Sequence, residues 1–451
     1  MPALTAELGR FVSGLALTDI PSEARAVART GIADCFGVMV AGARDPVVAL
    51  LDREMAGADG RELASLIPSL EKRNVEDAAL VNGAAAHVLD YDDVTLDGHP
   101  SAVLVPAIIA QGETLGVNGS ELMTAYVAGY EIWAELLARE PVPLHRKGWH
   151  PTAARGAVAA AAACAKLRQL SPEKCQTALS IAASMAGGLV ANFGSLTKCF
   201  QVGRAAQSGV IAARLADAGL TASPDTLEHQ SGFLAAFSPE GNADLSRAFD
   251  PQKKEWYLAR QGLNLKRYPV CYASHRAIDA ALELALRHDL KPSDVDHIRV
   301  STGEMQMLML RSERPKTAFE AKFSMQFAMA SSIVARSVGL SQLTDQFVGS
   351  AEVQSLIPRV STMTTKETMN GSAFAPSESV EITTVEGQVI ASEPVVYAKG
   401  SMQRPLSRGE LQDKFLDCLG DDLAAKTKTD AFEKLMNLER LNGAVDLLAL
   451  Q

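Results

Sequence analysis

Alanine-rich segments in which apolar residues recur every three to four positions follow one another through the first 250 residues. This spacing is typical of α-helices that bury one face or most of their surface. Several segments begin with asparagine, serine or proline and end near glycine, as helix capping predicts. The first 21 residues form a further amphipathic pattern and lack the basic start and apolar core of a signal peptide. We expect the other helices within residues 21–42, 74–91, 101–116, 118–139, 151–169, 171–188 and 202–220.

The pattern changes after about residue 262, where strand signals begin to alternate with helices. Residues 295–302 alternate like a strand, and residues 379–398 form two strand patterns around the turn "EGQ". Helices are expected at 275–288 and 320–338, and helical spacing returns after residue 404. This region therefore differs in class from the helical region that precedes it.

Length and composition set the domain organisation. A chain of 451 residues is too long for one compact core, so we expect two domains. Hydrophobic residues make up 47% of the chain and aromatic residues only 5%, which suits helices packed closely through alanine and glycine. We predict a mainly α fold, with a large all-helical domain over residues 1–262 plus 401–451 and a smaller α+β domain over residues 263–400.

Charge, hydropathy and cysteine usage argue against several classes of protein. The net charge is −10 without a basic run, which argues against a nucleic-acid partner. The longest apolar runs, such as residues 157–165, are far shorter than a membrane span. The six cysteines show no metal-ligand spacing, which favours reduced, buried thiols in a cytoplasmic protein over an iron–sulfur cluster.

Two of the eight histidines precede a proline at the start of an expected helix. They are His99, in "GHPSAV", and His150, in "GWHPTAA". Proline fits the first helical position, so each histidine should lie beside a helix N-terminus, where partial positive charge and free N–H groups favour anions. The same charge disfavours an imidazolium, and a neutral imidazole can act as a base near pH 7. Because His-Pro is also a common cap pair, a purely structural role is the alternative.

Lys198 and His275 place two more cation-capable groups at expected helix starts. Lys198, in "GSLTKCFQVG", precedes a long helix, where a lysine does not favour helix stability. This position suggests a cation recruited for binding, and a plain surface lysine is the alternative. His275, in "YPVCYASHRAID", follows a proline-bearing loop and opens another helix.

The segment "HVLDYDDV" (87–94) adds acidic residues near His99. If the preceding helix continued through it, Asp90 would share a face with Asp93 and with His87. An aspartate beside a base histidine would orient the ring and tune its pKa. His87 itself has the pattern of a packed helix residue. A metal site is the rival interpretation, and the sequence lacks the HxH or HExxH spacing that would support it.

Four motifs, in order along nearly the whole chain, resemble the MmgE/PrpD family. They are "NGAAAHVLDYDDV" with "GHPSAVLVPA", "GWHPTAARGAVAAAAACAKL", "FGSLTKCFQVGRAAQSGVIAARLADAGLTASPDTLE" and "LKRYPVCYASHRAIDAAL". That family includes 2-methylcitrate dehydratase, cis-aconitate decarboxylase and iminodisuccinate epimerase. The resemblance implies an all-helical domain formed by both chain ends, an inserted α+β lid domain, a homodimer, and a reaction that needs neither a metal nor an organic cofactor.

The resemblance also implies which residues form the site. Matched motif by motif, the active-site positions of the family fall on Asp90, His99, His150, Lys198 and His275. The substrates that the resemblance implies are small di- or tricarboxylates, and Lys198 and His275 are the expected carboxylate binders.

Departures from the family pattern bear on the substrate. Val94 stands where the family usually has threonine, and "TKCFQ" replaces a family "TKP" with a nearby histidine. Phe327 occupies a position that is tyrosine in some decarboxylases. We expect Val94 and Phe327 to line the substrate site together with Lys198 and His275. The missing hydroxyl and imidazole groups argue against decarboxylation.

These features together predict a cofactor-independent lyase that moves a proton at a carbon atom of a small polycarboxylate. Dehydration, as in 2-methylcitrate dehydratase, is the leading reaction. Epimerisation of an aminodicarboxylate such as iminodisuccinate, and decarboxylation of cis-aconitate, are the alternatives. An inactive, helical, dimeric metabolite-binding protein is the alternative of a different class, and the presence of all five charged positions argues against it.

Overall fold

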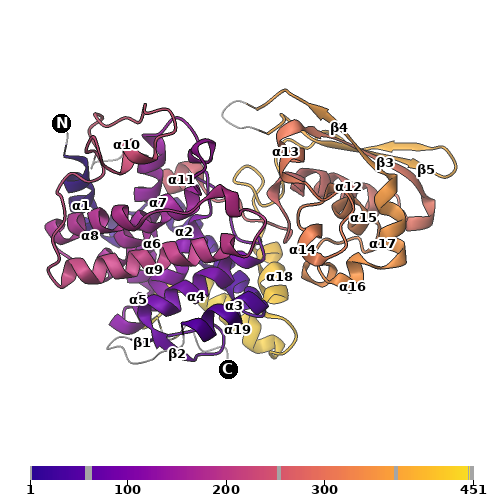
Figure 1. Cartoon of the computed structure of the whole chain (residues 1–451). Helices are drawn as coiled ribbons and strands as arrows, with labels where there is room; N and C mark the ends of the chain where they lie inside the picture. Colours follow the sequence, from indigo (N-terminus) through magenta and orange to yellow (C-terminus); the bar gives the residue numbers. More distant parts are fainter. Residues whose placement is uncertain (1–2, 56–62, 251–254, 370–373, 445, 447–451) are drawn as a thin grey trace. The chain divides into compact units, whose positions relative to one another are not determined.

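The computed structural model describes residues 3–55, 63–250, 255–369, 374–444 and 446 (Figure 1). Contacts divide the chain into two compact units, Met1–Leu263 with Gly409–Gln451, and Asn264–Arg408. Among the described residues, the first unit is helical apart from one two-stranded sheet, and the second combines helices with a four-stranded sheet. The chain is therefore mainly α, as predicted. The domain limits expected near residues 262 and 401, and the role of the second unit as a lid, stay predictions.

Long helices that begin at the expected caps build the first unit. Pro100 and Pro151 are the first residues of α5 and α7, and the side chains of Asn118 and Ser171 cap α6 and α8. The strands β1 (Leu63–Ser65) and β2 (Lys72–Asn74) form a short antiparallel pair that the sequence did not predict. The helices are α1 (Leu4–Gly14), α2 (Ser22–Gly42), α3 (Pro46–Glu54), α4 (Val75–Val88), α5 (Pro100–Leu115), α6 (Gly119–Ala138), α7 (Pro151–Leu167), α8 (Pro172–Met185), α9 (Thr197–Asp217), α10 (Phe233–Phe237), α11 (Tyr257–Gln261), α18 (Arg408–Leu419) and α19 (Ala425–Met436).

Glycine lets α4 and α7 approach α9 closely. A Cβ atom on Gly203 of α9 would lie 2.2 Å from the carbonyl oxygen of Leu80 in α4. A Cβ atom on Gly209 would lie 2.3 Å from the Cβ of Ala160 in α7. Protein interiors are packed too densely to absorb such overlaps without moving a helix. The small residues of α4, α7 and α9 therefore fix how these three helices pack.

The contacts along these helices also show their directions. Ala160 lies against Gly209 in the middle of α7 and α9, and His150 and Gln201 are hydrogen-bonded near the starts of both helices, so α7 and α9 run parallel. Arg214 near the end of α9 forms an ion pair with Glu76 at the start of α4, so α4 runs antiparallel to α9. The C-terminus of α4 therefore lies near the N-terminus of α9.

Helix α5 runs parallel to α7. A Cβ atom on Gly156 of α7 would lie 3.0 Å from the side chain of Val103 in α5, and further along both helices the thiol of Cys164 points at the carbonyl oxygen of Ala107. The N-termini of α5, α7 and α9 and the C-terminus of α4 therefore lie at one end of the first unit. His99, His150 and Lys198 stand at these three N-termini.

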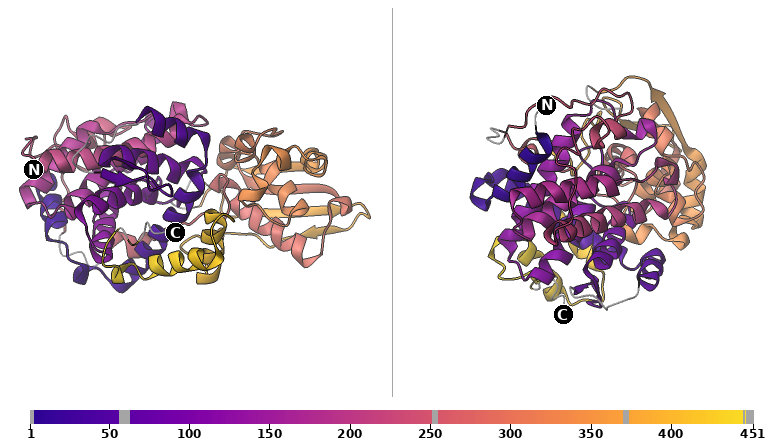
Figure 2. Two further views of the ribbon diagram at one scale, coloured as in Figure 1. Left: turned by 90° about the horizontal axis from the view of Figure 1, so that it is seen from below. Right: turned by 60° about the vertical axis from the view of Figure 1, so that its left-hand side comes forward.

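The C-terminal segment packs on the N-terminal helices of the first unit, as the return of helical spacing predicted (Figure 2). Lys414 of α18 forms a buried ion pair with Asp34 of α2, with 2.7 Å between Nζ and Oδ1. The same ammonium group donates to the carbonyl oxygen of Tyr91 at 2.9 Å and lies 4.0 Å from the centroid of its ring. Helix α18 thus holds the segment that follows α4.

The second unit places its helices on one side of a four-stranded sheet (Figure 1). The strand order is β4 (Val360–Thr365), β3 (Val295–Gly303), β5 (Ser379–Thr384) and β6 (Val389–Ala391), with β3 parallel to β4 and antiparallel to β5. Ile298 and Val300 of β3 are buried in the apolar core of this unit. The helices are α12 (His275–Arg287), α13 (Glu304–Met309), α14 (Ala318–Ala321), α15 (Met325–Val334), α16 (Asp345–Val348) and α17 (Ala351–Leu356).

The strands expected at 295–302 and 379–398 are confirmed, one expectation for this region needs correction, and one strand was not predicted. The single helix expected at 320–338 is divided, because α14 ends at Ala321 and Ser324 caps α15 by accepting the backbone N–H of Phe327 at 3.1 Å. Serine offers this hydrogen bond as an alternative to continuing a helix. Strand β4 was not predicted, because its short sequence "VSTMTT" lacks an alternation of apolar and polar residues.

No single helix in the described part of the chain is long and apolar enough to cross a membrane. The pair formed by α2 and α3, bent by 86°, meets that test by length and composition only.

We predict that the ion pair of Lys414 anchors the C-terminal segment. Lys414→Met should lower the free energy of unfolding by about 3–5 kcal/mol, because Asp34 is left as an uncompensated buried charge. The double variant Asp34→Asn/Lys414→Met should recover most of this loss, whereas Lys426→Met, at an exposed position of α19, should change stability by less than about 0.5 kcal/mol. Urea unfolding measures these values, and equal losses in the single and double variants would contradict the role of the pair.

Candidate active site

His99 and His150 lie at helix N-termini, as their sequence context predicted. His99 is the N-cap residue of α5 and His150 is the N-cap residue of α7, and each is followed by the proline that opens its helix. Neither imidazole caps its own helix with a side-chain hydrogen bond. Both side chains are therefore free of the capping role that was their structural alternative, and each ring has other partners.

The partners of His150 fix which of its nitrogens carries the proton. Its Nδ1 lies 2.7 Å from Oε1 of Gln201, and Nε2 of the same amide donates to the carbonyl oxygen of Leu189 at 3.2 Å. The amide oxygen therefore faces the ring, so Nδ1–H of His150 donates and Nε2 carries the lone pair. Burial, with the positive charge of Lys198 adding to it, holds the pKa of His150 well below its ordinary value. His150 is thus a neutral imidazole whose basic atom is Nε2.

The same reasoning assigns the tautomer of His99. Its Nδ1 lies 2.8 Å from the backbone carbonyl oxygen of Asp93. A carbonyl oxygen only accepts hydrogen bonds, so Nδ1 of His99 carries a hydrogen and Nε2 carries the lone pair in the neutral ring. Both histidines therefore present the same nitrogen for proton transfer.

A buried carboxylate joins His99 to a second histidine. Oδ2 of Asp92 lies 2.9 Å from Nδ1 of His99 and 2.9 Å from Nδ1 of His87, and the two rings lie 4.5 Å apart. Burial alone would raise the pKa of Asp92, but its electrostatic interactions and hydrogen bonds with His87 and His99 outweigh burial and hold this pKa well below its ordinary value. Burial lowers the pKa of His87 to about 4, so His87 is a neutral donor at pH 7.

The helix expected through residues 74–91 ends earlier, which corrects the predicted role of the aspartates. Helix α4 stops at Val88, and Asp90 adopts a left-handed backbone with a φ of 52°. Asp90 and Asp93 therefore do not share a helix face with His87. Asp92, and not Asp90, is the carboxylate beside the histidines, and His87 is more than the packed helix residue that the sequence predicted.

Asp90 instead pairs with Lys198 at the start of α9. Nζ of Lys198 lies 2.9 Å from Oδ1 of Asp90, and both side chains are largely buried, with 18% and 11% exposed. The ring of Phe193 lies beside both helix starts, at 5.5 Å from Nζ of Lys198 and 4.9 Å from the ring of His150. Lys198 is therefore an ordered cation in a site and not a freely solvated surface lysine.

One group of side chains in the described residues has the composition of a metal site. Ligand atoms of His87, Asp92 and His99 all lie within 4.8 Å of one another. However, Nδ1–H of His99 donates to the Asp93 carbonyl oxygen, so that nitrogen has no lone pair for a metal. The geometry is that of a hydrogen-bonded carboxylate, and the absence of a metal from the reaction stays a prediction.

The remaining predicted site residues have different surroundings. His275 is the first residue of α12 in the second unit, where its buried ring donates from Nε2 to the carbonyl oxygen of Val270 at 3.2 Å. Val94 is half-buried, directly after Asp93. Phe327 is fully buried in the core of the second unit, with its ring against that of Phe347. Phe327 is therefore a packing residue here, and the substrate contacts of all three residues stay predictions.

Sequence reasoning missed the roles of Asp92 and Gln201. Gln201 lies three positions after Lys198 and so on the same face of α9, a spacing that could have identified it as a partner at this end of the unit. Asp92 reaches both histidines only because the chain turns at Asp90, and aspartate is among the residues that tolerate a left-handed backbone. The local sequence permits this turn without specifying it.

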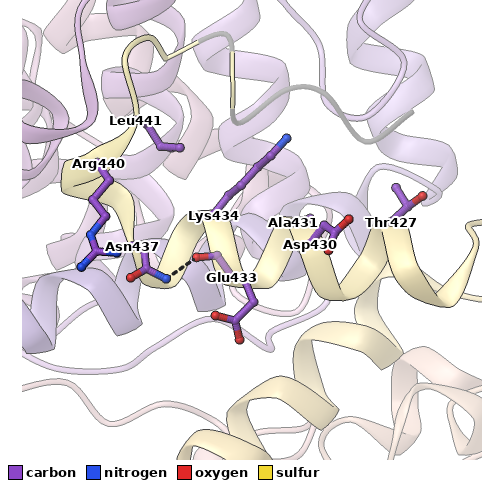
Figure 3. A pocket seen from close by; sticks show the side chains of 8 residues that line it. All are labelled: Thr427, Asp430, Ala431, Glu433, Lys434, Asn437, Arg440 and Leu441. Atoms are coloured by element: carbon purple, nitrogen blue, oxygen red, sulfur yellow. Dashed lines mark hydrogen bonds between the residues drawn. The ribbon is translucent and has the colours of Figure 1, made fainter.

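A hollow elsewhere on the first unit contains none of these residues. Its volume is about 500 Å³, and it lies along α19 and the turn that follows (Figure 3). Two of its lining residues are joined by a hydrogen bond within the helix, because Nδ2 of Asn437 donates to the carbonyl oxygen of Glu433 at 2.8 Å. The hollow is lined by Thr427, Asp430, Ala431, Glu433, Lys434, Asn437, Arg440 and Leu441. It carries side chains of both charges and has no histidine, so we do not assign the chemistry to it.

Asp93 should make stability depend on pH. Burial, with the negative charge of Asp92 adding to it, raises the pKa of Asp93 to about 8 from an ordinary value of 3.8. Between these values the folded protein holds a proton that the unfolded chain releases, so the contribution of Asp93 to stability is complete below about pH 4 and is lost as the pH rises toward 8.

The variant Asp93→Asn lacks this titration and isolates it. The difference in unfolding free energy, wild type minus variant, should fall by about 1.4 kcal/mol per pH unit between pH 5 and 8 and level off above that range. Denaturant unfolding at a series of pH values measures the difference. A difference that stays constant over this range would show that Asp93 is already ionised in the folded protein.

The chain matches two family models and several characterised proteins. Residues 6–246 match the MmgE/PrpD N-terminal domain and residues 268–438 match the MmgE/PrpD C-terminal domain. Cis-aconitate decarboxylase from Mus musculus is 29% identical over 354 residues, which are 75% of this chain and 70% of the relative. The protein of the same name from Homo sapiens is 27% identical over 388 residues, covering 83% and 78% of the two chains, and that from Aspergillus terreus is 26% identical over 479 aligned residues, covering 99% and 95%. The two models together span most of the sequence, and the chain therefore belongs to the MmgE/PrpD family of enzymes.

Proposed function

We propose that this enzyme is a cofactor-independent lyase that moves a proton at a carbon atom of a small polycarboxylate. One observation supports this most strongly. His99 and His150 each present Nε2 as a basic atom, and they stand with the cation Lys198 at three helix N-termini at one end of the first unit. Such a set can remove and return protons while holding carboxylates, because helix N-termini and a lysine both favour anions.

The proposed roles follow from this geometry. His99 and His150 are the proton-transferring pair. Lys198 binds a substrate carboxylate and stabilises the negative charge that develops when the carbon loses its proton, and Asp90 holds the Lys198 ammonium in place at 2.9 Å. His275, at the N-terminus of α12 in the second unit, is outside this geometry, and its role as a carboxylate-binding residue stays a prediction.

Dehydration of a citrate-like acid is the reaction that we propose first. Val94, directly after Asp93, has no hydroxyl group. Gln201 accepts a hydrogen bond from His150, whereas the family resemblance places a histidine in this region. Decarboxylation is the second candidate, because the relatives from Mus musculus, Homo sapiens and Aspergillus terreus are named cis-aconitate decarboxylases. Phe327 is buried in the core of the second unit, so its lack of a hydroxyl group no longer argues against decarboxylation. The missing hydroxyl group at Val94 still does. A homodimer and a cytoplasmic location remain predictions.

Lys198→Met should reduce kcat/KM by about 10²–10³-fold, equivalent to about 3–4 kcal/mol of transition-state stabilisation. Lys174 offers a matched control, because its Nζ forms an ion pair of the same length, 2.9 Å, with Asp217 at the other end of α9. Lys174→Met should leave the kinetics unchanged, and both variants should remain folded by circular dichroism. Near-wild-type turnover by a folded Lys198→Met variant would return this lysine to a structural role.

The reaction can be identified by its products. A panel of citrate-like, aconitate-like and aminodicarboxylate-like acids is incubated with the enzyme in heavy water and followed by NMR, with a strong chelator present throughout. We expect a conjugated double bond from a hydroxy acid, deuterium exchange next to a carboxylate, and little carbon dioxide from cis-aconitate. Efficient release of carbon dioxide would select the second candidate. If the chelator abolishes activity and added zinc or magnesium restores it, a metal-free reaction is refuted. If none of the acids undergoes deuterium exchange or turnover, an inactive binding protein is favoured.

A further inference from the structure

Asp92, His87 and His99 form a buried trio in which the carboxylate contacts both imidazoles, and of the three only His99 takes part in the proposed proton transfer. Asp92 has no exposed surface, and it is the one carboxylate that both imidazoles contact among the residues that the structure describes. Of the two rings, only that of His99 reaches the surface, with 13% of its side chain exposed against 1% for His87. His99 is thus the member of the trio that a substrate can reach, and His87 is the fully buried member.

Hydrogen-bond roles in the trio are set by what each atom can do. An ionised carboxylate only accepts, so the Nδ1 atoms of both His87 and His99 must carry hydrogens. His99 Nδ1–H is also shared with the carbonyl oxygen of Asp93 at 2.8 Å. The Nε2 atom of His87 is buried and has no hydrogen-bond partner among the described residues, so nothing holds a second proton on that ring. His87 therefore acts only as a neutral donor to Asp92.

We propose that Asp92 and His87 are positioning residues for His99: the carboxylate fixes the Nδ1–H tautomer and orientation of the His99 ring, and His87 holds the carboxylate. This inference rests on the proposed function, in which Nε2 of His99 takes or returns the proton of the substrate. When His99 becomes an imidazolium, Asp92 lies 2.9 Å from its Nδ1–H and stabilises the positive charge. No proton needs to pass to Asp92 or His87 for this.

The tautomers can be measured without substrate, and a change of one atom in Asp92 tests the role of its charge. Asp92→Asn keeps the size of the side chain, but an amide offers one acceptor and one donor where the carboxylate offers two acceptors. Both Nδ1–H groups meet the same oxygen, Oδ2, and an amide oxygen there can still accept from both, so the variant allows the same tautomers but removes the negative charge that stabilises the His99 imidazolium. Ring-¹⁵N-labelled histidine reports the tautomer by NMR, and His99→Gln and His87→Asn identify the two signals. Nδ1–H on both rings in the wild type, and a kcat at least 100-fold lower in Asp92→Asn, are the expected results.

Kinetics of variants at His87 separate positioning from packing. His87→Leu fills similar space without a donor and should lower kcat at least 100-fold with little change in KM. His87→Asn carries an amide N–H that can reach Asp92 in place of Nδ1–H, and it should stay within about tenfold of the wild type. His145→Asn is the control, because His145 is half exposed and its Nδ1 lies 3.6 Å from Asp97, outside the trio; it should have no effect.

The outcomes distinguish this inference from the proposed function. If the wild type turns over none of the acids, the proposed function fails while the tautomer measurement still decides the arrangement of the trio. The positioning inference is overturned if the wild-type His99 ring carries its hydrogen on Nε2, or if Asp92→Asn keeps the wild-type kcat. It is also overturned if His87→Leu and His87→Asn lose activity equally while remaining folded, because packing alone would then explain both losses.

Discussion

The crossing of α4, α7 and α9 through glycine and alanine is the constraint on which the candidate site depends. At Gly203 and Gly209 the neighbouring helices approach so closely that a Cβ atom would overlap Leu80 or Ala160. This packing, with α5 alongside α7, directs three helix N-termini and one C-terminus to the same end of the unit. The partial positive charges of the N-termini then add at one place, which suits a substrate with several carboxylates.

The same end of the unit buries several titratable side chains, and their neighbours define their protonation states. Asp92 stays ionised because two imidazoles donate to it, whereas Asp93, the next residue, has a pKa raised to about 8 by burial and by the charge of Asp92. Lys414 ties the neighbouring Tyr91 carbonyl oxygen to Asp34 of α2. Neutral His150 and ion-paired Lys198 complete a site in which proton positions are set by the protein before a substrate arrives.

Much of this arrangement could be predicted from local sequence. His-Pro at 99–100 and 150–151 placed two histidines at helix N-termini, and Lys198 was expected at the start of α9, because caps and prolines act over a few residues. The strands at 295–302 and 379–398 followed from alternation in the same way. These signals are local, so a single sequence is enough to read them.

The parts that were wrong or missed depend on contacts between distant residues or on one backbone angle. Because α4 ends at Val88 and Asp90 has a left-handed backbone, Asp92 lies beside the histidines in place of Asp90. The pairing of Lys414 with Asp34 joins residues 380 positions apart, which periodicity does not reveal. Phe327 lies in the core of the second unit, and its expected contact with the substrate stays a prediction.

A crystal structure with a bound tricarboxylate such as citrate tests the proposed chemistry most directly. We predict that carboxylates lie at the N-termini of α5, α7 and α9, that Nζ of Lys198 contacts one of them, and that Nε2 of His99 or His150 lies about 3 Å from the carbon-bound hydrogen or the hydroxyl that leaves. A tricarboxylate bound elsewhere, with these three side chains left without contact to it, would contradict the assignment of the site.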